Sequence, residues 1–192
     1  MTDWLKARKK KATRRPDVIV LHGVEGSGKT SFAAQFTDAT VAMSENETGL
    51  ITLASKGLIP ETAYFPPFDN WLNNIEATKQ VLVADDKDRP RTLVYDTING
   101  FASALVNHVC ERDFDGDMGK FLAYGGRAGW GTCFTLWVEW LSMLDAIRSK
   151  GTTILLLAHT MTKTFKNPEG PDYDIYTPDV PDALLSPVKK FA

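Results

Sequence analysis

Gly23-Val24-Glu25-Gly26-Ser27-Gly28-Lys29-Thr30 is the stretch of sequence that decides the fold of this chain. It fits the pattern G-x-x-x-x-G-K-[ST], the phosphate-binding P-loop. The β-branched and apolar run at 18–21 is typical of a buried parallel strand, and residues 31–36 have the character of the first turns of a helix. A strand, a glycine-rich loop and a helix in this order form an anion site, because backbone N–H groups turn inward at the helix N-terminus. This context predicts that the chain binds a nucleoside triphosphate.

The residue types in this loop have defined roles. Lys29 is expected to reach the β- and γ-phosphates, and the Thr30 hydroxyl is expected to ligate Mg²⁺. The predicted nucleotide-binding residues are Gly23, Val24, Glu25, Gly26, Ser27, Gly28, Lys29, Thr30 and Ser31. The alternative is a glycine-rich turn that matches by chance, and the flanking strand and helix argue against it.

The composition predicts one folded domain with a basic arm. The chain has 192 residues, of which 43% are hydrophobic, and this is enough for a full core. Seven Lys or Arg residues lie between positions 6 and 15, although the net charge of the whole chain is −2. We therefore expect a basic, mobile N-terminal arm at 1–15 and the domain at 16–192. Such an arm suits polyanion binding, and a solvated tail that aids solubility is the alternative.

Cysteine usage and hydropathy indicate the compartment. Cys110 and Cys133 form no C-x-x-C pair, so neither a zinc site nor a disulfide framework is indicated. Two thiols without a signal sequence favour the cytoplasm, and the absence of an 18-residue apolar stretch predicts no membrane span. The chain stops at 189–192 without a recognisable closing element, which favours a truncated C-terminus.

Apolar segments of strand length alternate with helical segments along the chain. Further strands are expected at 40–43, 93–96 and 154–158, helices at 71–82, 98–110 and 132–150, and long loops at 57–69, 111–131 and 160–181. The first of these helices is expected to be N-capped by Asp69 and to pack Leu72 inward, and the third to bury Phe134, Trp137 and Trp140. This order predicts an α/β fold in three layers, with a mainly parallel sheet flanked by helices.

Parallel strands bring their C-terminal ends to one edge of the sheet, where polar groups are then expected to converge. Asp96 ends an apolar strand, the usual position of the acid that holds Mg²⁺ through its water shell, and we expect it to have that role. The alternative role for Asp96 is the N-cap of the helix that follows. Hydrolysis needs a group that orients or deprotonates water, and Glu47 and Glu45 compete for that role. His159 is expected to sense the γ-phosphate or the water, and a structural histidine is the alternative.

With these residues in place, the chain resembles the RecA-like ATPases, and more closely the short phage single-strand-annealing ATPases. The resemblance covers roughly residues 17–180. It rests on the P-loop at 23–30, the turn Glu47-Thr48-Gly49-Leu50, the strand ending at Asp96 and the strand ending in Leu157-Ala158-His159. It implies a slow, DNA-stimulated ATPase that uses ATP and Mg²⁺ and acts with single-stranded DNA in annealing or recombination. A single-strand-binding protein is the implied partner.

The resemblance also implies how DNA and neighbouring subunits are bound. The loops at 111–131 and 160–176 correspond by position to two DNA-binding loops, which makes Arg127, Lys163 and Lys166 candidate phosphate contacts and Tyr124 or Phe165 candidate stacking platforms. The many acids in these loops weaken the argument for DNA. Such subunits assemble head to tail as homo-oligomers. Lys189 or Lys190 is then a candidate for completing a neighbour's site, and Trp4-Leu5-Lys6-Ala7 resembles the aromatic-x-x-Ala peptide that links subunits.

Two other functions stay open at this point. One is a P-loop kinase acting on a small molecule or nucleotide, although neither long loop contains the arginine cluster that such lids usually have. The other is an assembly protein that ATP controls and that never contacts DNA.

Overall fold

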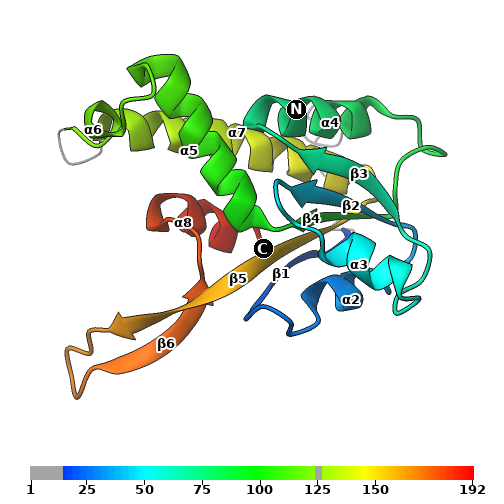
Figure 1. Cartoon of the computed structure of the whole chain (residues 1–192), viewed down its shortest axis with the longest axis horizontal. Coiled ribbons are helices and arrows are strands. Elements are labelled where there is room, and N and C mark those ends of the chain that lie inside the picture. The colour runs from blue at the N-terminus through cyan, green and yellow to red at the C-terminus, as the bar shows by residue number, and fades with distance from the viewer. Residues whose placement is uncertain (1–14, 124–126) are drawn as a thin grey trace, which may run out of the picture.

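The computed structural model describes residues 15–123 and 127–192, in which strands and helices alternate (Figure 1). The strands are β1 (Val18–Gly23), β2 (Ala39–Ser44), β3 (Ala63–Phe68), β4 (Thr92–Asp96), β5 (Thr153–Phe165) and β6 (Tyr173–Pro178). The helices are α2 (Lys29–Ala33), α3 (Gly49–Ser55), α4 (Trp71–Val83), α5 (Ile98–Phe114), α6 (Met118–Phe121), α7 (Arg127–Ser149) and α8 (Asp182–Phe191). The predictions made for Trp4-Leu5-Lys6-Ala7 and for Tyr124 lie outside the described residues.

The strands of the described residues form a mainly parallel sheet, as predicted. Its order is β1-β5-β4-β2-β3 with all neighbours parallel, and β6 pairs with β5 in the antiparallel direction. The ends of β1, β2 and β4 therefore lie along the same edge of the sheet as the middle of β5, where Gly23 pairs with His159.

Helices cover both faces of this sheet, which gives the three-layer α/β arrangement (Figure 1). Successive residues of a strand point to opposite faces. Tyr95 and Leu156 accordingly pack under α4, α5, α7 and α8, whereas Val94 and Leu155 pack against Ala33 of α2 and other residues of the smaller core.

The larger core is aromatic. Trp71 of α4 stacks on Trp137 of α7 with ring centroids 5.9 Å apart, and Tyr95 meets Trp140 edge-on at 5.0 Å. The expectation that the aromatic residues of the 132–150 helix are buried is correct for Trp137 and Trp140. It is wrong for Phe134, whose side chain is 46% exposed.

Two strands lie in segments that were predicted to be loops. β3 falls in the 57–69 segment and contains Pro66 and Pro67. Proline cannot donate to a strand ladder, and β3 is tolerated because it is an edge strand that pairs only with β2. β6 falls in the 160–181 segment, where β5 continues past His159 and turns back as a hairpin. Most side chains of this hairpin are polar or exposed, so its strands lack the apolar run of a buried strand.

The 111–131 segment is also more ordered than predicted. α5 extends to Phe114, Asp117 caps α6 by accepting from the Gly119 and Lys120 N–H groups, and α7 begins at Arg127. Gly129 was part of the reason for expecting a loop. A Cβ there would lie 2.3 Å from the Phe121 ring, so this glycine allows α6 to pack against α7.

Three local predictions were wrong for reasons that the structure makes clear. α4 is capped by Asn70, whose side chain accepts from Asn73 N–H, and not by Asp69. Leu72 lies on the outer side of α4 and is 58% exposed. No helix was predicted after residue 150, yet residues 182–191 form α8, which buries Leu184, Leu185 and Val188. Pro187 inside that helix obscured its amphipathic pattern.

Candidate functional site

The P-loop connects β1 to α2 along the sheet edge. Gly28 adopts φ 88°, in the left-handed region that favours glycine, and it is the residue that precedes α2. A Cβ on Gly23 would lie 2.6 Å from Ser27 Oγ, so a larger residue at this position would force the Ser27 hydroxyl to move. These two glycines give the loop the curvature that the motif predicts.

Lys29 lies inside this loop. Its side chain is 8% exposed, and Nζ donates hydrogen bonds to the carbonyl oxygens of Gly23 at 2.9 Å and Val24 at 3.0 Å. The ammonium group is therefore held among backbone groups at the mouth of a cavity of about 520 Å³ that it helps to line.

Thr30 and Asp96 meet directly. Thr30 Oγ1 donates a hydrogen bond of 2.6 Å to Asp96 Oδ2, which joins the start of α2 to the end of β4. Asp96 is 3% exposed. Burial raises the pKa of its carboxyl group above the ordinary value and the charge of Glu47 adds to this, whereas the Thr30 hydrogen bond and Lys29 lower it. The residue at the N-cap of α5 is Thr97, so Asp96 does not have the capping role that was its alternative.

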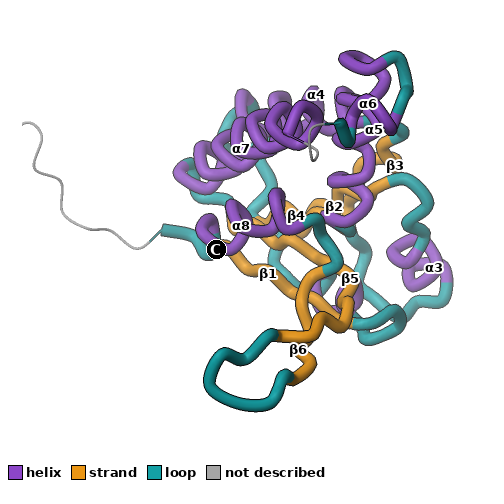
Figure 2. The backbone as a smooth tube through the Cα atoms, turned by 90° about the vertical axis from the view of Figure 1, so that its left-hand side faces the viewer, coloured by secondary structure: helices purple, strands orange, loops and turns teal. Residues whose placement is uncertain are grey.

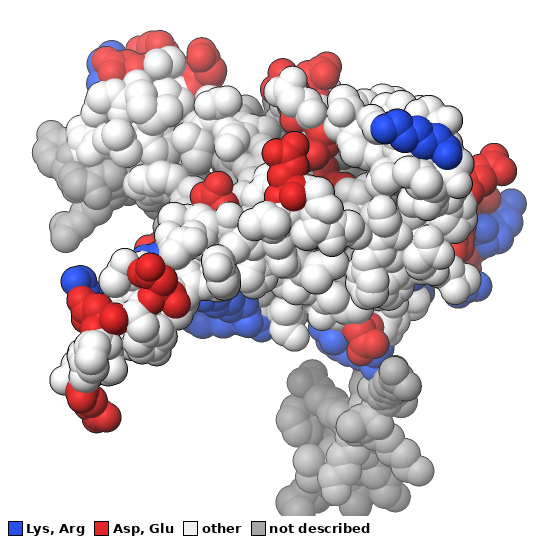
Figure 3. Space-filling view, turned by 60° about the horizontal axis from the view of Figure 1, so that its bottom comes forward, with Lys and Arg blue, Asp and Glu red and all other residues white. Residues whose placement is uncertain are grey.

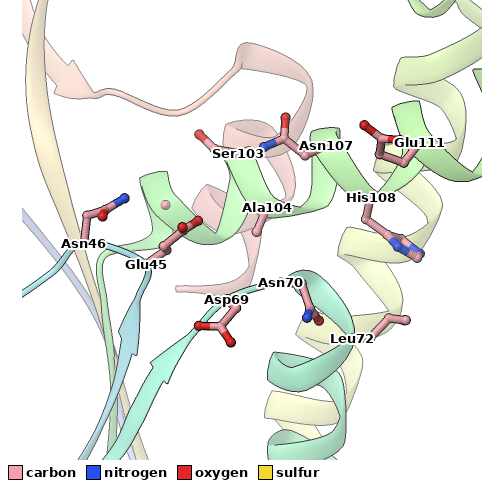
Figure 4. A pocket seen from close by; sticks show the side chains of 11 residues that line it. Glu45, Asn46, Asp69, Asn70, Leu72, Ser103, Ala104, Asn107, His108 and Glu111 are labelled. Carbon is pink, nitrogen blue, oxygen red and sulfur yellow. The ribbon is translucent and has the colours of Figure 1, made fainter. Parts of the chain in front are cut away.

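Glu47 faces the same cavity from the turn after β2. Its Oε1 accepts a hydrogen bond from Thr97 Oγ1 at 3.2 Å and lies 3.2 Å from His159 Nε2. Glu45 is exposed and lines a different pocket of about 470 Å³, together with Asp69 and one side of α5 (Figure 4). The structure thus brings Glu47, and not Glu45, together with the P-loop.

His159 is fixed through its backbone on β5. Its N–H donates to Asn99 Oδ1 at 2.9 Å, and its carbonyl oxygen accepts from Asp179 N–H at 2.9 Å. Asn99 Nδ2 in turn donates to the Asp179 carbonyl. One residue further on, Thr160 Oγ1 lies 2.9 Å from Nδ1 of His22, the residue before the P-loop.

Of the predicted nucleotide-binding residues, six line the 520 Å³ cavity: Glu25, Gly26, Gly28, Lys29, Thr30 and Ser31. Gly23 is the last residue of β1, and in the turn that follows Ser27 N–H donates to the carbonyl of the exposed Val24 at 3.2 Å. The cavity is also lined by Glu47, Asp96 and His159, so the proposed catalytic and metal-holding groups share it with the P-loop.

Sequence reasoning missed several residues that hold this site together. Ser44 Oγ at the end of β2 accepts from Thr97 N–H at 3.2 Å. Gly100 makes that approach possible, because a Cβ there would lie 2.2 Å from Ser44 Oγ. Thr97 and Asn99 lie one and three positions after Asp96, and their polar side chains after a buried strand were the available signal. Nothing in the sequence pattern marks Ser44 or Gly100.

The candidate DNA-contacting residues lie apart from this cavity. Lys163 and Lys166 are on or next to the β5–β6 hairpin, and each forms an ion pair, with Asp182 at 2.6 Å and Asp172 at 2.5 Å respectively. Acidic and basic side chains are interspersed along this projection, at the lower left of the molecule (Figure 3). Arg127 is the first residue of α7.

Aromatic side chains are prominent on the same hairpin. Phe165 and Tyr173 pair with ring centroids 5.1 Å apart, and Tyr176 is 76% exposed. Lys189 and Lys190 lie elsewhere, exposed in the last turn of α8.

Comparison with known protein families gives a match that covers nearly the whole described chain. The family model described as an AAA domain matches residues 15–191. No curated protein matches the sequence. In the described part of the chain, none of the helices combines the length and apolar character that crossing a membrane requires.

Proposed function

This chain belongs to the AAA domain family of P-loop ATPases, and we propose that it is a Mg²⁺-dependent, RecA-like ATPase that acts with single-stranded DNA in phage recombination or annealing. The observation that carries the proposal is the 2.6 Å hydrogen bond between Thr30 and Asp96, in a cavity that Lys29, Glu47 and His159 also line. A phosphate-binding loop, two oxygen donors for a cation and a carboxylate beside them are the parts that ATP hydrolysis needs.

The residues present fit ATP and Mg²⁺. Lys29 and the backbone N–H groups of the loop suit the β- and γ-phosphates, and the hydroxyl of Thr30 with the carboxylate of Asp96 supplies the oxygen ligands that Mg²⁺ prefers. Burial raises the pKa of Asp96, and a bound divalent cation would favour its ionised form. A Mg²⁺ ion held by Thr30 and Asp96 would offset the negative charge of the phosphates.

In this proposal Glu47 orients or deprotonates the water that attacks the γ-phosphate. Its carboxylate accepts a proton from the water or orients the water by accepting a hydrogen bond. Thr97 Oγ1 and His159 Nε2 both lie 3.2 Å from Oε1 of this carboxylate, which restricts its orientation. Glu45 has no such contacts and is proposed to be a surface charge.

The β5–β6 hairpin is the proposed DNA-contacting element. Phe165, Tyr173 and Tyr176 offer faces on which bases can stack, an interaction worth about 1–3 kcal/mol per base. Lys163 and Lys166 pair with acids at the surface, and exposed pairs are weak enough to exchange for phosphate. β5 continues from His159 into the hairpin, so the nucleotide cavity and the stacking surface share a strand.

The proposal extends to assembly. From the resemblance to the phage ATPases we propose head-to-tail homo-oligomers in which Lys189 or Lys190 completes the site of a neighbouring subunit. The same resemblance implies a single-strand-binding protein as partner.

Phosphate release measured with the full chain tests the proposal. We expect Mg²⁺-dependent hydrolysis of ATP that EDTA abolishes and that single-stranded DNA stimulates, with DNA binding that weakens steeply as salt rises. Lys29→Ala is the inactive control. If DNA does not change the hydrolysis rate and no single strands are retained on a filter at low salt, the proposed action with DNA is refuted. The proposed ATPase activity would not be affected by that result.

The same experiment separates the two other functions. Transfer of phosphate to a nucleoside monophosphate instead of water would establish a kinase. A change of assembly size on adding a non-hydrolysable ATP analogue, with no effect of DNA, would establish an assembly protein.

A further inference from the structure

An apolar groove lies between α7 and α8, away from the residues of the nucleotide cavity. Phe134, Val138 and Leu141 line it from α7, and Pro187 and Phe191 line it from α8, around a volume of about 360 Å³. Phe134 is 46% exposed although it continues the buried aromatic stripe of α7. A large aromatic side chain exposed in a concave apolar surface is typical of a docking site.

The N-terminal segment joins the described chain at one end of this groove. Arg148 Nε of α7 donates a hydrogen bond of 2.6 Å to the Pro16 carbonyl, and an Arg15 guanidinium nitrogen lies 3.7 Å from Asp145 Oδ1. Asp145 is itself a groove-lining residue. The first described residues accordingly lie beside the C-terminal part of α7, and Figure 2 shows them as the loop segment at its left.

The sequence before Arg15 contains apolar residues that suit the groove. In residues 1–14, Trp4 and Leu5 are adjacent large apolar side chains, and the residues that follow them are mainly Lys and Arg. A tryptophan provides a large area of apolar surface for a groove lined by Phe, Val, Leu and Pro side chains. Lys190 also lines the groove, and its cation is compatible with the face of an indole ring.

The connecting chain is long enough for this contact. Trp4 precedes Arg15 by eleven residues, which can span about 36 Å when extended. Phe134 and Asp145, which both line the groove from α7, are also eleven residues apart, and in a helix this separation corresponds to about 16 Å. Trp4 can therefore reach any part of the groove from its own chain. The short tether also gives it a higher effective concentration than a second copy would have.

We propose that the groove between α7 and α8 is the docking site of the N-terminal arm of the same chain, with Trp4 and Leu5 covering Phe134 and its apolar neighbours. The Arg15–Asp145 pair and the Arg148–Pro16 hydrogen bond fix the other end of the arm. The basic residues between these two attachments are then held over the surface of α7 and α8. This inference does not depend on the nucleotide site or on DNA.

Disulfide formation in the full chain tests the proposal. Thr2→Cys is combined with Ser186→Cys, which places the second thiol in the groove, or with Ser149→Cys, which places it on the exposed last residue of α7 and outside the groove. Both partner changes are Ser→Cys at exposed helix positions, so they are matched. The native Cys110 and Cys133 are buried.

A docked arm predicts an intrachain disulfide with Ser186→Cys that forms at least about fivefold faster than the one with Ser149→Cys. Adding Trp4→Ser or Phe134→Ala should reduce the faster rate to that of the control pair. Equal rates for the two pairs would show an arm that does not dock in the groove. A covalent dimer as the main product of the Ser186→Cys pair would show docking on a second copy. Either result overturns the proposal.

Discussion

Glu47 Oε1 lies 3.2 Å from His159 Nε2, which joins the turn after β2 to the strand that continues into the hairpin. The same oxygen accepts from Thr97 Oγ1, so elements β2, β4 and β5 of the sheet edge meet at one carboxylate. Between Glu45 and Glu47 lies Asn46 with φ 69°, a left-handed conformation that turns the two carboxylates toward different pockets. The two glutamates are therefore a matched pair for testing the catalytic role.

Glu47→Gln is expected to keep nucleotide affinity and to lose about 10²–10⁴-fold in hydrolysis rate, because an amide cannot accept the proton of the attacking water. Phosphate release and the affinity for a fluorescent ATP analogue measure the two effects. Glu45→Gln, the control, should behave nearly as the unchanged protein. The reverse result for the two variants would move the catalytic role to Glu45.

Lys29→Ala is expected to lose nucleotide affinity. A charge-assisted hydrogen bond is worth about 1.5–3 kcal/mol, which corresponds to roughly a 10- to 150-fold increase in the dissociation constant. Titration with the same fluorescent analogue measures it. Lys56→Ala removes an exposed lysine at the end of α3 and should leave the affinity unchanged. Equal losses in both variants would indicate only a general effect of positive charge.

Asp96→Asn tests the buried carboxylate through stability. Because burial raises the pKa of Asp96 in the folded state, ionisation of this carboxyl group costs stability at neutral pH. This cost disappears as the pH falls through the raised pKa toward the ordinary pKa of an aspartate. Without metal, the unchanged protein should therefore gain stability relative to Asp96→Asn when the pH is lowered from 7 through this range. Thermal unfolding of both proteins across the range measures the difference.

Metal addition gives the complementary result. Mg²⁺ with nucleotide should raise the unfolding temperature of the unchanged protein and should raise that of Asp96→Asn much less, because one of the two oxygen ligands has lost its charge. Equal stabilisation of both proteins would remove Asp96 from the proposed metal site.

Tyr176→Ala is expected to weaken binding of single-stranded DNA by about 1–3 kcal/mol if bases stack on the hairpin. Tyr64→Ala is the control, because Tyr64 is also an exposed aromatic residue on a strand, at 49%, but lies on β3 at the far edge of the sheet. Fluorescence anisotropy of a labelled oligonucleotide at low salt compares them. A loss that is equal in both variants, or absent in both, would argue against the hairpin as the DNA surface.

The parts of the fold that the sequence predicts are those whose periodicity is unambiguous. β1, β2, β4 and the inner half of β5 are apolar runs with β-branched residues. β2, β4 and that part of β5 are buried between helices, and β1 is partly buried along its whole length. β3 and β6 lack that pattern, since one is an edge strand with Pro66 and Pro67 and the other belongs to a projecting hairpin. Their strand conformation depends on neighbours that are distant in sequence.

The candidate site divides in the same way. The P-loop and Asp96 could be selected as candidates from local sequence, a motif and a strand end, and residues of both line one cavity. The choice between Glu45 and Glu47 depends on the φ of Asn46, which no residue pattern specifies. The positions of Ser44 and Gly100 depend on how closely α5 approaches β2, a contact between segments more than fifty residues apart.

Gly100→Ala tests that close approach. The added Cβ would lie 2.2 Å from Ser44 Oγ and 2.5 Å from Ser44 Cβ, so α5 must move away from β2, at a cost of about 1–3 kcal/mol in the free energy of unfolding. The shift also separates Thr97 N–H from Ser44 Oγ, so hydrolysis should fall as well. Gly131→Ala is the matched control in α7, where nothing lies within 4 Å of the added Cβ, and it should stabilise the protein by about 0.5–1 kcal/mol. Urea denaturation of the two variants measures both effects, and equal stabilisation by the two substitutions would show that α5 and β2 are not in contact at this point.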